Sequence, residues 1–374
     1  MELMKMNNSV CSVKENTMKR ISVFSVVVMM VLTFVSAAWA LPFPITDVRA
    51  LGMGGAFVAA GEGIGAVQYN PALLAKDSTV GVVLPEVVIR LEDHIGLADI
   101  IDDLDNLNLP ADTTQAISIL NKLRQGGALD VQTSASAGAG FGLFGISAGV
   151  TYSQLIYGTA FPSDISTNPA TLTDPGVNQL QYNAIEARQI ILTGAKSFGN
   201  ITVGVNLRNI DATAYSDSVS LFDDPGTGIG DITDGVQTDE SATSIDVGAV
   251  MELTPLLDVG IVAKDINGPE LGDFEMDPRY RIGAALHLPM ITVAADYDVT
   301  KDDSGGTEYQ DWAIGAEFDV WAIALRAGLS NNSGLSGAPT LIHLGVGLGF
   351  LDIGAAYAKD GDYYMAGINL GLGF

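Results

Sequence analysis

The chain contains few of the residues that carry most enzymatic and metal chemistry. Among 374 residues there is one cysteine, Cys11, and there are three histidines, His94, His287 and His343. A single cysteine cannot form an internal disulfide, and because Cys11 precedes a targeting segment, the chain that follows has no thiol chemistry. The histidines show neither a His-x-x-x-His spacing nor a cysteine partner. We therefore expect no metal site and no cofactor.

Positive charge is also scarce. The chain has 18 Lys+Arg against 44 Asp+Glu, and the first 40 residues hold four of the former and two of the latter. The remaining residues therefore carry 14 against 42, a formal charge of −28. A nucleic-acid groove and a polybasic membrane patch both need cations to meet phosphates. Neither nucleic acid nor an anionic membrane surface is an expected partner.

One long apolar run lies near the N-terminus. Lys19-Arg20 precedes an uncharged run from Ile21 to Ala38, and Ala38-Trp39-Ala40 supplies the small-x-small pattern that a signal peptidase cleaves. We predict a cleaved signal peptide over residues 1–40. Residues 1–17 are not needed for it and fit an extension from an earlier start codon. The alternative is a single membrane-anchoring helix.

Beyond residue 40 there is no run of 18 apolar residues, although 48% of the chain is hydrophobic. Apolar residues instead alternate with polar residues or glycine in segments of about ten, the length of a tilted membrane-spanning strand. The final segment shows this up to Phe374, the last residue. A soluble sandwich also alternates. Inner faces that mix both charge signs with glycine, and aromatic residues near the strand ends, favour a barrel surrounded by outer-membrane lipid.

The alternation predicts an all-β fold, a transmembrane antiparallel β-barrel of about 14 strands over residues 79–374. Short turns, the first at Gly140, alternate with longer loops, which places both termini on the periplasmic side. In the fourth strand Glu186 and Arg188 interrupt the pattern. The predicted strands are 79–90, 129–138, 141–157, 181–197, 200–213, 242–253, 256–266, 279–288, 290–300, 309–319, 320–329, 340–350, 351–359 and 363–374.

Helical spacing marks the first long loop, residues 91–128. Apolar residues recur over Leu97–Leu107, and an Asp112-x-x-Gln115 capping pattern opens a second run that continues to Leu123. We interpret this helical first extracellular loop as a hairpin resting on the barrel rim. A lid or an apolar landing groove at the outer mouth is the alternative.

Charged residues fall on the faces predicted to line the lumen. We interpret them as mutually paired groups that hold an internal plug, in preference to an ion-selectivity filter. They are Arg208, Lys264, Arg279, Arg281 and Arg326, facing Asp246, Glu252, Asp258, Asp296, Asp311, Glu317 and Asp352.

Two further patterns are interpreted as structural. The acidic loop from Ser216 to Glu240 could hold calcium, but its spacing does not match an EF-hand, and a solvated loop is favoured. The Gly-x-Ser-x-Gly sequence of a hydrolase nucleophile elbow occurs at Gly145-Ile146-Ser147-Ala148-Gly149. The elbow requires a strand-turn-helix, whereas this segment lies within a predicted strand. We therefore expect no catalytic residues and no enzyme.

The residues before the first strand carry a recognisable pattern. Arg49-Ala50-Leu51-Gly52-Met53-Gly54-Gly55-Ala56-Phe57, followed by Tyr69-Asn70-Pro71-Ala72-Leu73-Leu74, resembles the FadL-type family of outer-membrane barrels, which take up long-chain fatty acids and other hydrophobic compounds. Within that superfamily the chain is most similar to the conjugal-transfer TraF-like branch. The resemblance implies that residues 41–78 form a hatch inside the barrel. It also implies a hatch and substrate path that includes Gly54, Gly55, Phe57, Tyr69, Asn70, Pro71 and Ala72.

The resemblance implies passive transport of hydrophobic small molecules, such as fatty acids or hydrocarbons, across the outer membrane of a Gram-negative bacterium. Two departures favour the less understood branch. Leu73 stands where the transporters commonly have glycine, and Gly61-Glu62-Gly63 replaces a frequent acidic pair. The alternative function is a structural or secretion- or conjugation-associated envelope protein that acts through protein partners.

Overall fold

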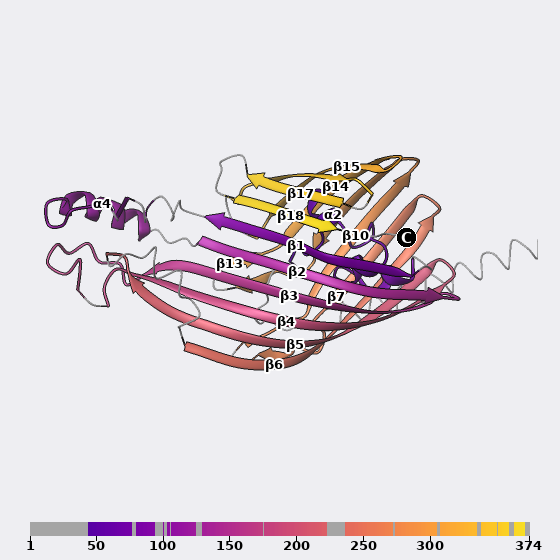
Figure 1. Ribbon diagram of the computed structural model, residues 1–374, viewed down its shortest axis with the longest axis horizontal. Helices are drawn as coiled ribbons and strands as arrows, with labels where there is room; N and C mark the ends of the chain where they lie inside the picture. Colours follow the sequence, from indigo (N-terminus) through magenta and orange to yellow (C-terminus); the bar gives the residue numbers. More distant parts are fainter. Residues whose placement is uncertain are drawn as a thin grey trace, which may run out of the picture.

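The chain forms a closed antiparallel barrel (Figure 1). The computed structural model describes residues 44–76, 80–93, 100, 103–104, 106–124, 129–174, 176–222, 236–271, 274–304, 307–334, 338–349, 351–358 and 363–370. The barrel strands are β1 (Gly81–Asp93), β2 (Leu129–Leu143), β3 (Ile146–Ser163), β4 (Gln179–Phe198), β5 (Ile201–Ser220), β6 (Val236–Thr254), β7 (Leu257–Lys264), β10 (Arg279–Leu288), β11 (Ile291–Asp298), β14 (Asp311–Val320), β15 (Ile323–Asn332), β16 (Leu341–Gly347), β17 (Leu351–Ala358) and β18 (Tyr363–Leu370).

The predicted all-β barrel is confirmed, and each of the fourteen predicted strands corresponds to one strand of the wall. Strand β18 closes the barrel by pairing with β1, from Glu86 opposite Asn369 to Glu92 opposite Tyr363. Phe374, on which the last strand was expected to end, lies outside the described residues, as does the predicted signal peptide.

The outer face of the wall is apolar. On neighbouring strands Leu325 and Leu344 are 49% and 53% exposed, while the alternate residues Arg326 and His343 are buried inside. Such a contiguous apolar belt is stable only against lipid or a partner surface. Phe144, 93% exposed, lies at the end with the short turns.

Among the described residues, no helix is both long and apolar enough to cross a membrane.

Two details of the strand prediction are wrong. The first hairpin does not turn at Gly140: β2 continues to Leu143 and the chain turns at Phe144-Gly145, both with positive φ. Gly140 instead lies in the wall, where a Cβ would come 3.0 Å from Leu74 of the segment inside the barrel. Strands β3 to β6 are also longer than predicted, with 18 to 20 residues where the predicted ranges 141–157, 181–197, 200–213 and 242–253 span 12 to 17.

The long strands extend beyond the rest of the barrel and support a separate apolar cluster, which we call the distal head. It comprises α4 (Thr113–Leu123), the outer ends of β3 to β5, and residues 164–174 (Figure 1). Leu120 and Leu123 of α4 pack with Leu180 and Tyr182 of β4. The predicted second helix is therefore present, but the expected position on the rim is wrong because the strands that carry it continue outward. Most of the first predicted helical stretch lies outside the described residues.

Two small hairpins, β8 (Glu270–Leu271) with β9 (Phe274–Glu275) and β12 (Asp302–Ser304) with β13 (Thr307–Tyr309), connect wall strands at the end with the long loops.

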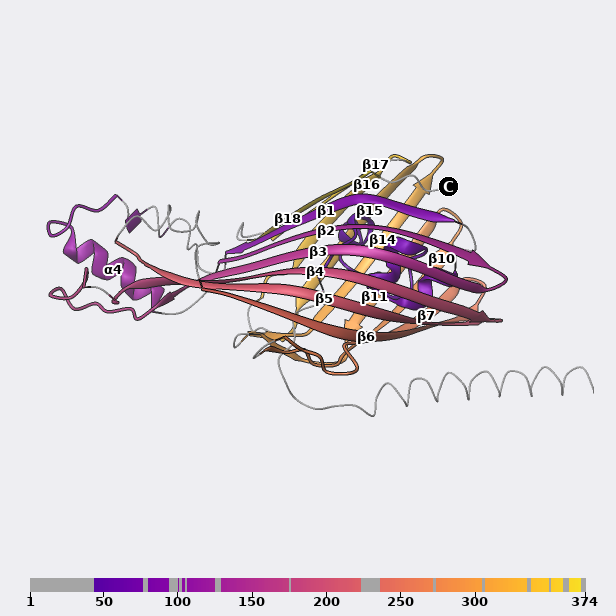
Figure 2. The same ribbon diagram turned by 60° about the horizontal axis from the view of Figure 1, so that its bottom comes forward.

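Residues 44–76 lie inside the barrel, where we refer to them as the hatch (Figure 2). They form three short helices, α2 (Val48–Gly52), η1 (Ile64–Gln68) and η2 (Pro71–Ala75). Helix α2 packs against β15 to β18 and β1, whereas η2 packs against β2 to β6. The hatch therefore touches both sides of the lumen.

Candidate functional site

Wall glycines let the hatch backbone come into direct contact with the barrel. A Cβ added to Gly328 would lie 2.5 Å from Gly54 N and Met53 C, and one at Gly315 would lie 2.8 Å from Met53 Cα. Both positions therefore require glycine. Gly315 and Gly328 are opposite each other on adjacent strands. We call the inward glycines of strands β5 to β18 that face the hatch the glycine collar: Gly204, Gly248, Gly260, Gly283, Gly315, Gly328, Gly345, Gly354 and Gly367.

Asn70 joins the hatch to itself and to the wall. Its side chain is fully buried, and its Oδ1 accepts a hydrogen bond from Ala72 N at 3.1 Å, which caps η2. Its Nδ2 donates to Val58 O at 3.0 Å and lies 3.3 Å from Ala249 O of β6 and 3.4 Å from Ile261 O of β7. Pro71 sets the first residue of η2, where its missing N–H is not needed.

An aromatic pair forms the centre of the hatch. The rings of Phe57 and Tyr69 meet edge to face, with centroids 5.1 Å apart and planes at 77°. The Tyr69 hydroxyl accepts a hydrogen bond from Thr46 N at 3.0 Å, and burial raises the pKa of Tyr69. Asp296 of β11 accepts from Phe57 N at 2.7 Å and Val58 N at 2.9 Å. A wall carboxylate thus satisfies two hatch donors that no strand pairs.

Ion pairs attach the hatch to the wall at the end with the short turns. Arg49 of α2 donates twice to Glu317, at 2.6 and 2.8 Å, and Arg326 donates to the same carboxylate at 2.5 Å. Burial disfavours the Arg49 cation, but Glu317 outweighs it and raises the pKa of Arg49. On the other side of the hatch, Lys76 pairs with Asp258.

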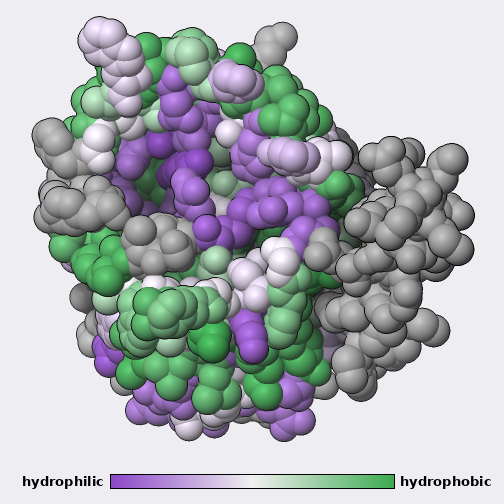
Figure 3. All heavy atoms as spheres, turned by 90° about the vertical axis from the view of Figure 1, so that its right-hand side faces the viewer, coloured by the Kyte–Doolittle hydropathy of each residue, from purple (hydrophilic) through white to green (hydrophobic). Residues whose placement is uncertain are grey.

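These groups are part of a polar surface within the barrel mouth. Seen from the end with the short turns, hydrophilic side chains gather in a central hollow surrounded by hydrophobic ones (Figure 3). Arg49 also pairs with Glu62 at 3.2 Å, and the Glu62 side chain is 63% exposed. The hatch closes the lumen behind this hollow.

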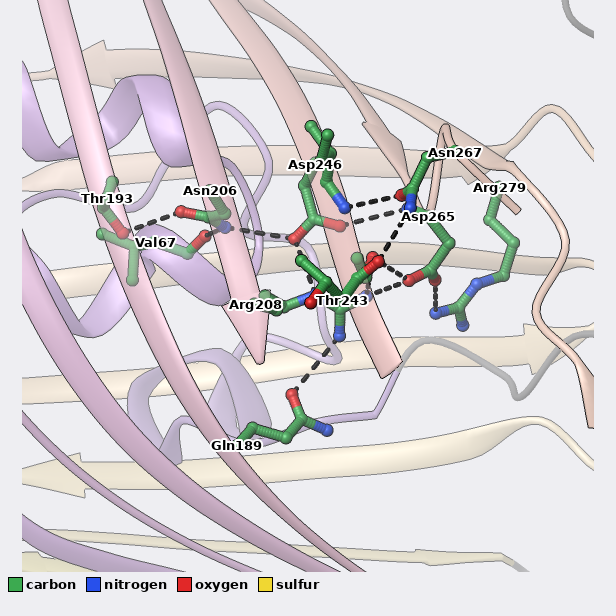
Figure 4. Close-up of polar contacts among 12 residues, drawn as sticks. Val67, Gln189, Thr193, Asn206, Arg208, Thr243, Asp246, Asp265, Asn267 and Arg279 are labelled. Carbon is green, nitrogen blue, oxygen red and sulfur yellow. Dashed lines mark hydrogen bonds and ion pairs between the residues drawn. The ribbon is translucent and has the colours of Figure 1, made fainter. Parts of the chain in front are cut away.

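A second network of charged groups lies in the wall on the other side of the hatch (Figure 4). Arg208 pairs with Asp246 at 3.2 Å and also with Asp265, which Arg279 contacts at 2.8 Å. Asn206 connects the network to the hatch by donating to Val67 O at 2.9 Å and to Asp246 at 3.2 Å.

This network borders a small cavity of about 40 Å³, which we call the basic cavity. Arg208, Lys264 and Arg279 line it together with Asp246. Counting the fully buried Asp265, which pairs with Arg208 and Arg279, three cations face two carboxylates, a formal excess of one positive charge that would favour an anionic group.

An apolar cavity of about 80 Å³ adjoins the basic cavity on the side away from the hatch. The two share Leu155, Gln189 and Met276 as lining residues. The apolar cavity is further lined by inward side chains of β4 and β5 and by one residue of β8: Ile185, Ala187, Ile210, Ala212, Ala214 and Leu271. Tyr157, Thr238 and Glu240 complete its lining.

A third cavity, of about 70 Å³, lies across the lumen. Gly54 and Gly55 of the hatch line it with Arg281, Asp296 and Asp311. It is mixed in character, since Trp312, Tyr363 and Met365 also contribute.

The luminal residues singled out from the sequence fall into three groups. Asp258, Asp296 and Glu317 bind the hatch directly, and Arg326 binds it through Glu317. Arg208, Lys264 and Arg279 line the basic cavity, whereas Arg281 and Asp311 line the third cavity.

Sequence reasoning missed the hatch cations and the apolar cavity. Arg49 and Lys76 were not assigned partners, although they are the basic residues of the described hatch. The signal for the cavity was present in β5, where the inward residues change from Asn206 and Arg208 to Ile210 and Ala212.

The described residues form a closed fourteen-strand antiparallel barrel with the hatch inside it. The chain belongs to the family described as "F plasmid transfer operon, TraF, protein", whose model matches residues 67–298. No curated protein matches the sequence.

Solved structures share the fold at low identity. The CymD monoaromatic hydrocarbon channel is 15% identical, with a TM-score of 0.54 and coverage of 88% of this chain and 97% of that one. The Ralstonia pickettii toluene transporter TbuX is 13% identical, with a TM-score of 0.56 and coverage of 86% and 96%. A Pseudomonas aeruginosa FadL homologue is 11% identical, with a TM-score of 0.52 and coverage of 90% and 97%. These values establish the shared architecture.

Proposed function

We propose that the protein is a channel for passive uptake of hydrophobic small molecules across the outer membrane. The observation that carries the proposal is the apolar cavity, which lies inside the barrel and adjoins the hatch through the basic cavity. Neighbours of the same fold are titled as a monoaromatic hydrocarbon channel and a toluene transporter. A mature N-terminus at Leu41, readable by mass spectrometry, is part of the same proposal.

The position of the hatch argues against transport through an open, water-filled pore. Its backbone contacts the glycine collar, and its Arg49, Lys76 and Asn70 are bonded to the wall. Solutes therefore cannot pass along the barrel axis without displacing the hatch. A channel that takes ligands into a cavity beside the wall does not need the hatch to leave the barrel axis. In such a channel the ligand would reach the hatch near Val67 and Asn206.

The two adjoining cavities favour an amphiphile with an anionic head over a plain hydrocarbon. The apolar cavity of about 80 Å³ is smaller than the roughly 150 Å³ engineered cavity that holds benzene. Extending a ligand into the basic cavity brings its head to Arg208, Lys264 and Arg279. A carboxylate there gains charge-assisted hydrogen bonds that toluene cannot make.

Uptake into proteoliposomes tests the proposal. Ala212→Trp fills the apolar cavity, while Leu207→Trp on the same strand adds an equal ring to the outer face, where Leu207 is 44% exposed. We expect Ala212→Trp to reduce uptake of a long-chain fatty acid and Leu207→Trp to leave it unchanged. The proposal is rejected if the unmodified protein transports neither a fatty acid nor toluene.

A charge variant separates the two ligand classes. Lys264→Met removes a cation from the basic cavity and keeps the length of the side chain. Fatty-acid uptake should fall and toluene uptake should not. Equal loss of both would mean that Lys264 acts on the barrel rather than on the ligand head.

The distal head favours a second candidate, an envelope protein that acts through protein partners. The head has its own apolar cluster beyond the barrel, which the closed wall does not require. Cross-linking in intact envelopes tests this candidate: a partner lost when residues 106–124 are replaced by a short linker supports it, and recovery of no stable partner rejects it.

A further inference from the structure

The tip of the distal head carries a polar cleft that the transport path does not use. It has a volume of about 340 Å³ and opens on the face of the strands opposite α4. Hydroxyl, amide and carboxylate groups line it: Ser163, Gln179, Gln181, Ser216, Asp217 and Ser218.

Strand alternation gives this part of the sheet two different faces. Leu180 and Tyr182 of β4 are buried in the apolar cluster with α4, and the alternate residues Gln179 and Gln181 point to the cleft. Gln181 is opposite Ser218 on β5. The amide groups of β4 and the hydroxyl groups of β5 therefore lie in adjacent rows, on strands whose opposite face packs against α4.

The rim of the cleft is held by a buried asparagine. Asn178 is fully buried, donates from Nδ2 to Leu172 O at 2.9 Å and accepts at Oδ1 from Ser166 N at 2.8 Å. Its backbone N–H donates to Asp164 O at 3.0 Å, and its carbonyl accepts from Leu221 N at 2.8 Å. These bonds fix the rim residue Asp164 against the end of β5, so a ligand would meet a preorganised surface.

The chemistry of the lining selects one class of ligand. Glutamine amides and serine hydroxyls both donate and accept. The Asp217 carboxylate is engaged by the chain itself, since it accepts from Ser218 N at 2.7 Å and from the Tyr182 hydroxyl at 3.5 Å. None of the described residues that line the cleft is Lys or Arg, so phosphate, sulfate and nucleic acid would find no counter-charge among them. The lining is too polar to hold a hydrocarbon or the aromatic anchors of a protein partner.

We propose that this cleft binds a neutral oligosaccharide, whose ring hydroxyls are both donors and acceptors. The position of the cleft agrees with a saccharide carried on an outer-membrane lipid. On β5 the outward residues change from apolar to polar at Asn209 and Asp211, and Ser218 is seven residues further on, about 23 Å along the strand. The cleft therefore lies beyond the lipid belt, on the side toward which the sugars of such a lipid would extend. The proposal requires an outer-membrane position but not transport.

Titration calorimetry with full-length protein in detergent micelles tests the proposal. The probes are neutral hexose oligosaccharides, and lipopolysaccharide with and without its distal polysaccharide. Gln181→Ala combined with Ser218→Ala removes one amide and one hydroxyl from the cleft. Ser118→Ala combined with Asn121→Ala removes the same groups from the exposed face of α4 and is the control. Heat-modifiable migration on gels verifies that each variant is folded.

We expect the unmodified protein to bind and the cleft variant to bind about tenfold more weakly, because two hydrogen bonds are lost. The control should bind as the unmodified protein does. Binding of free oligosaccharides supports the proposal for soluble glycans, and binding only of lipopolysaccharide that keeps its polysaccharide supports it for the lipid-borne form. Absence of binding at millimolar oligosaccharide, or equal weakening in the control, overturns it.

Discussion

Replacing Asn70 with alanine should undock the hatch while leaving the barrel folded. The side chain is fully buried and makes its bonds at the junction of hatch and wall. Alanine removes the cap on Ala72 N and the donor to Val58 O, which lie 3.1 and 3.0 Å away. No other change in the hatch removes both an internal bond and contacts to two wall strands at one residue.

The expected cost follows from those two bonds. Loss of a helix cap costs about 1 kcal/mol. A buried carbonyl that loses its donor costs about 1–3 kcal/mol. The longer contacts to Ala249 O and Ile261 O, at 3.3 and 3.4 Å, add little. A total of about 3 kcal/mol raises the undocked fraction of the hatch by roughly a hundredfold.

Hydrogen exchange measures this fraction directly. Amides of residues 57–72 should exchange roughly a hundredfold faster in the variant, while amides of β6 and β7 keep their rates. Asn200→Ala is the matched control, since Asn200 also loses one bond, to Glu252 O at 3.0 Å, but lies in a turn outside the lumen. If the wall strands exchange faster together with the hatch, Asn70 stabilises the whole barrel and the reasoning fails.

Three further substitutions test other parts of the structure. Gly328→Ala places a Cβ 2.5 Å from the hatch backbone and should destabilise docking of the hatch by about 1–3 kcal/mol, measured by hydrogen exchange. Gly194→Ala is the control, because its Cβ meets nothing within 4 Å, and it should have no effect. Equal effects of the two substitutions would contradict the close approach of hatch and wall at Gly328. Glu317→Gln removes the carboxylate shared by Arg49 and Arg326 and should lower the stability of hatch docking by about 1–3 kcal/mol. This is less than the cost of breaking a fully buried ion pair. An unchanged hydrogen-exchange rate of the hatch would refute this prediction. Leu120→Ala should destabilise the distal head by about 2–5 kcal/mol and expose it to protease without unfolding the barrel, with Ser118→Ala as control; loss of the barrel as well would show that the two fold as one unit.

The wall was predictable from sequence because lipid imposes a strict period of two. Leu344 and His343 differ in environment for that reason alone, and the same rule locates every strand. The rule fails where strands leave the lipid. Glu186 and Arg188 interrupt the pattern and pair with each other, but they do not end β4. They mark the level at which its outer face meets water.

The partners of the luminal charges were not predictable. Alternation indicates that Asp296 points inward, but its partner Phe57 N is 239 residues away in sequence. Such contacts depend on how deeply the hatch sits and on how each strand is shifted along its neighbour. For the apolar cavity the sequence carried part of the signal, the change to Ile210 and Ala212 on β5, but the meeting of Ile210 with Leu271 follows only from the closed barrel.

The glycine collar also bears on how the strands find their alignment. A shift of two residues along β15 keeps every side chain on its face, so the lipid belt alone cannot prevent it. That shift would place Arg326 or Ser330 where Gly328 meets the hatch backbone, and no side chain fits there. The hatch precedes the strands in the chain and touches nearly all of them. A shifted β15 would therefore clash with the docked hatch, so the hatch favours the observed alignment where the lipid belt does not distinguish it.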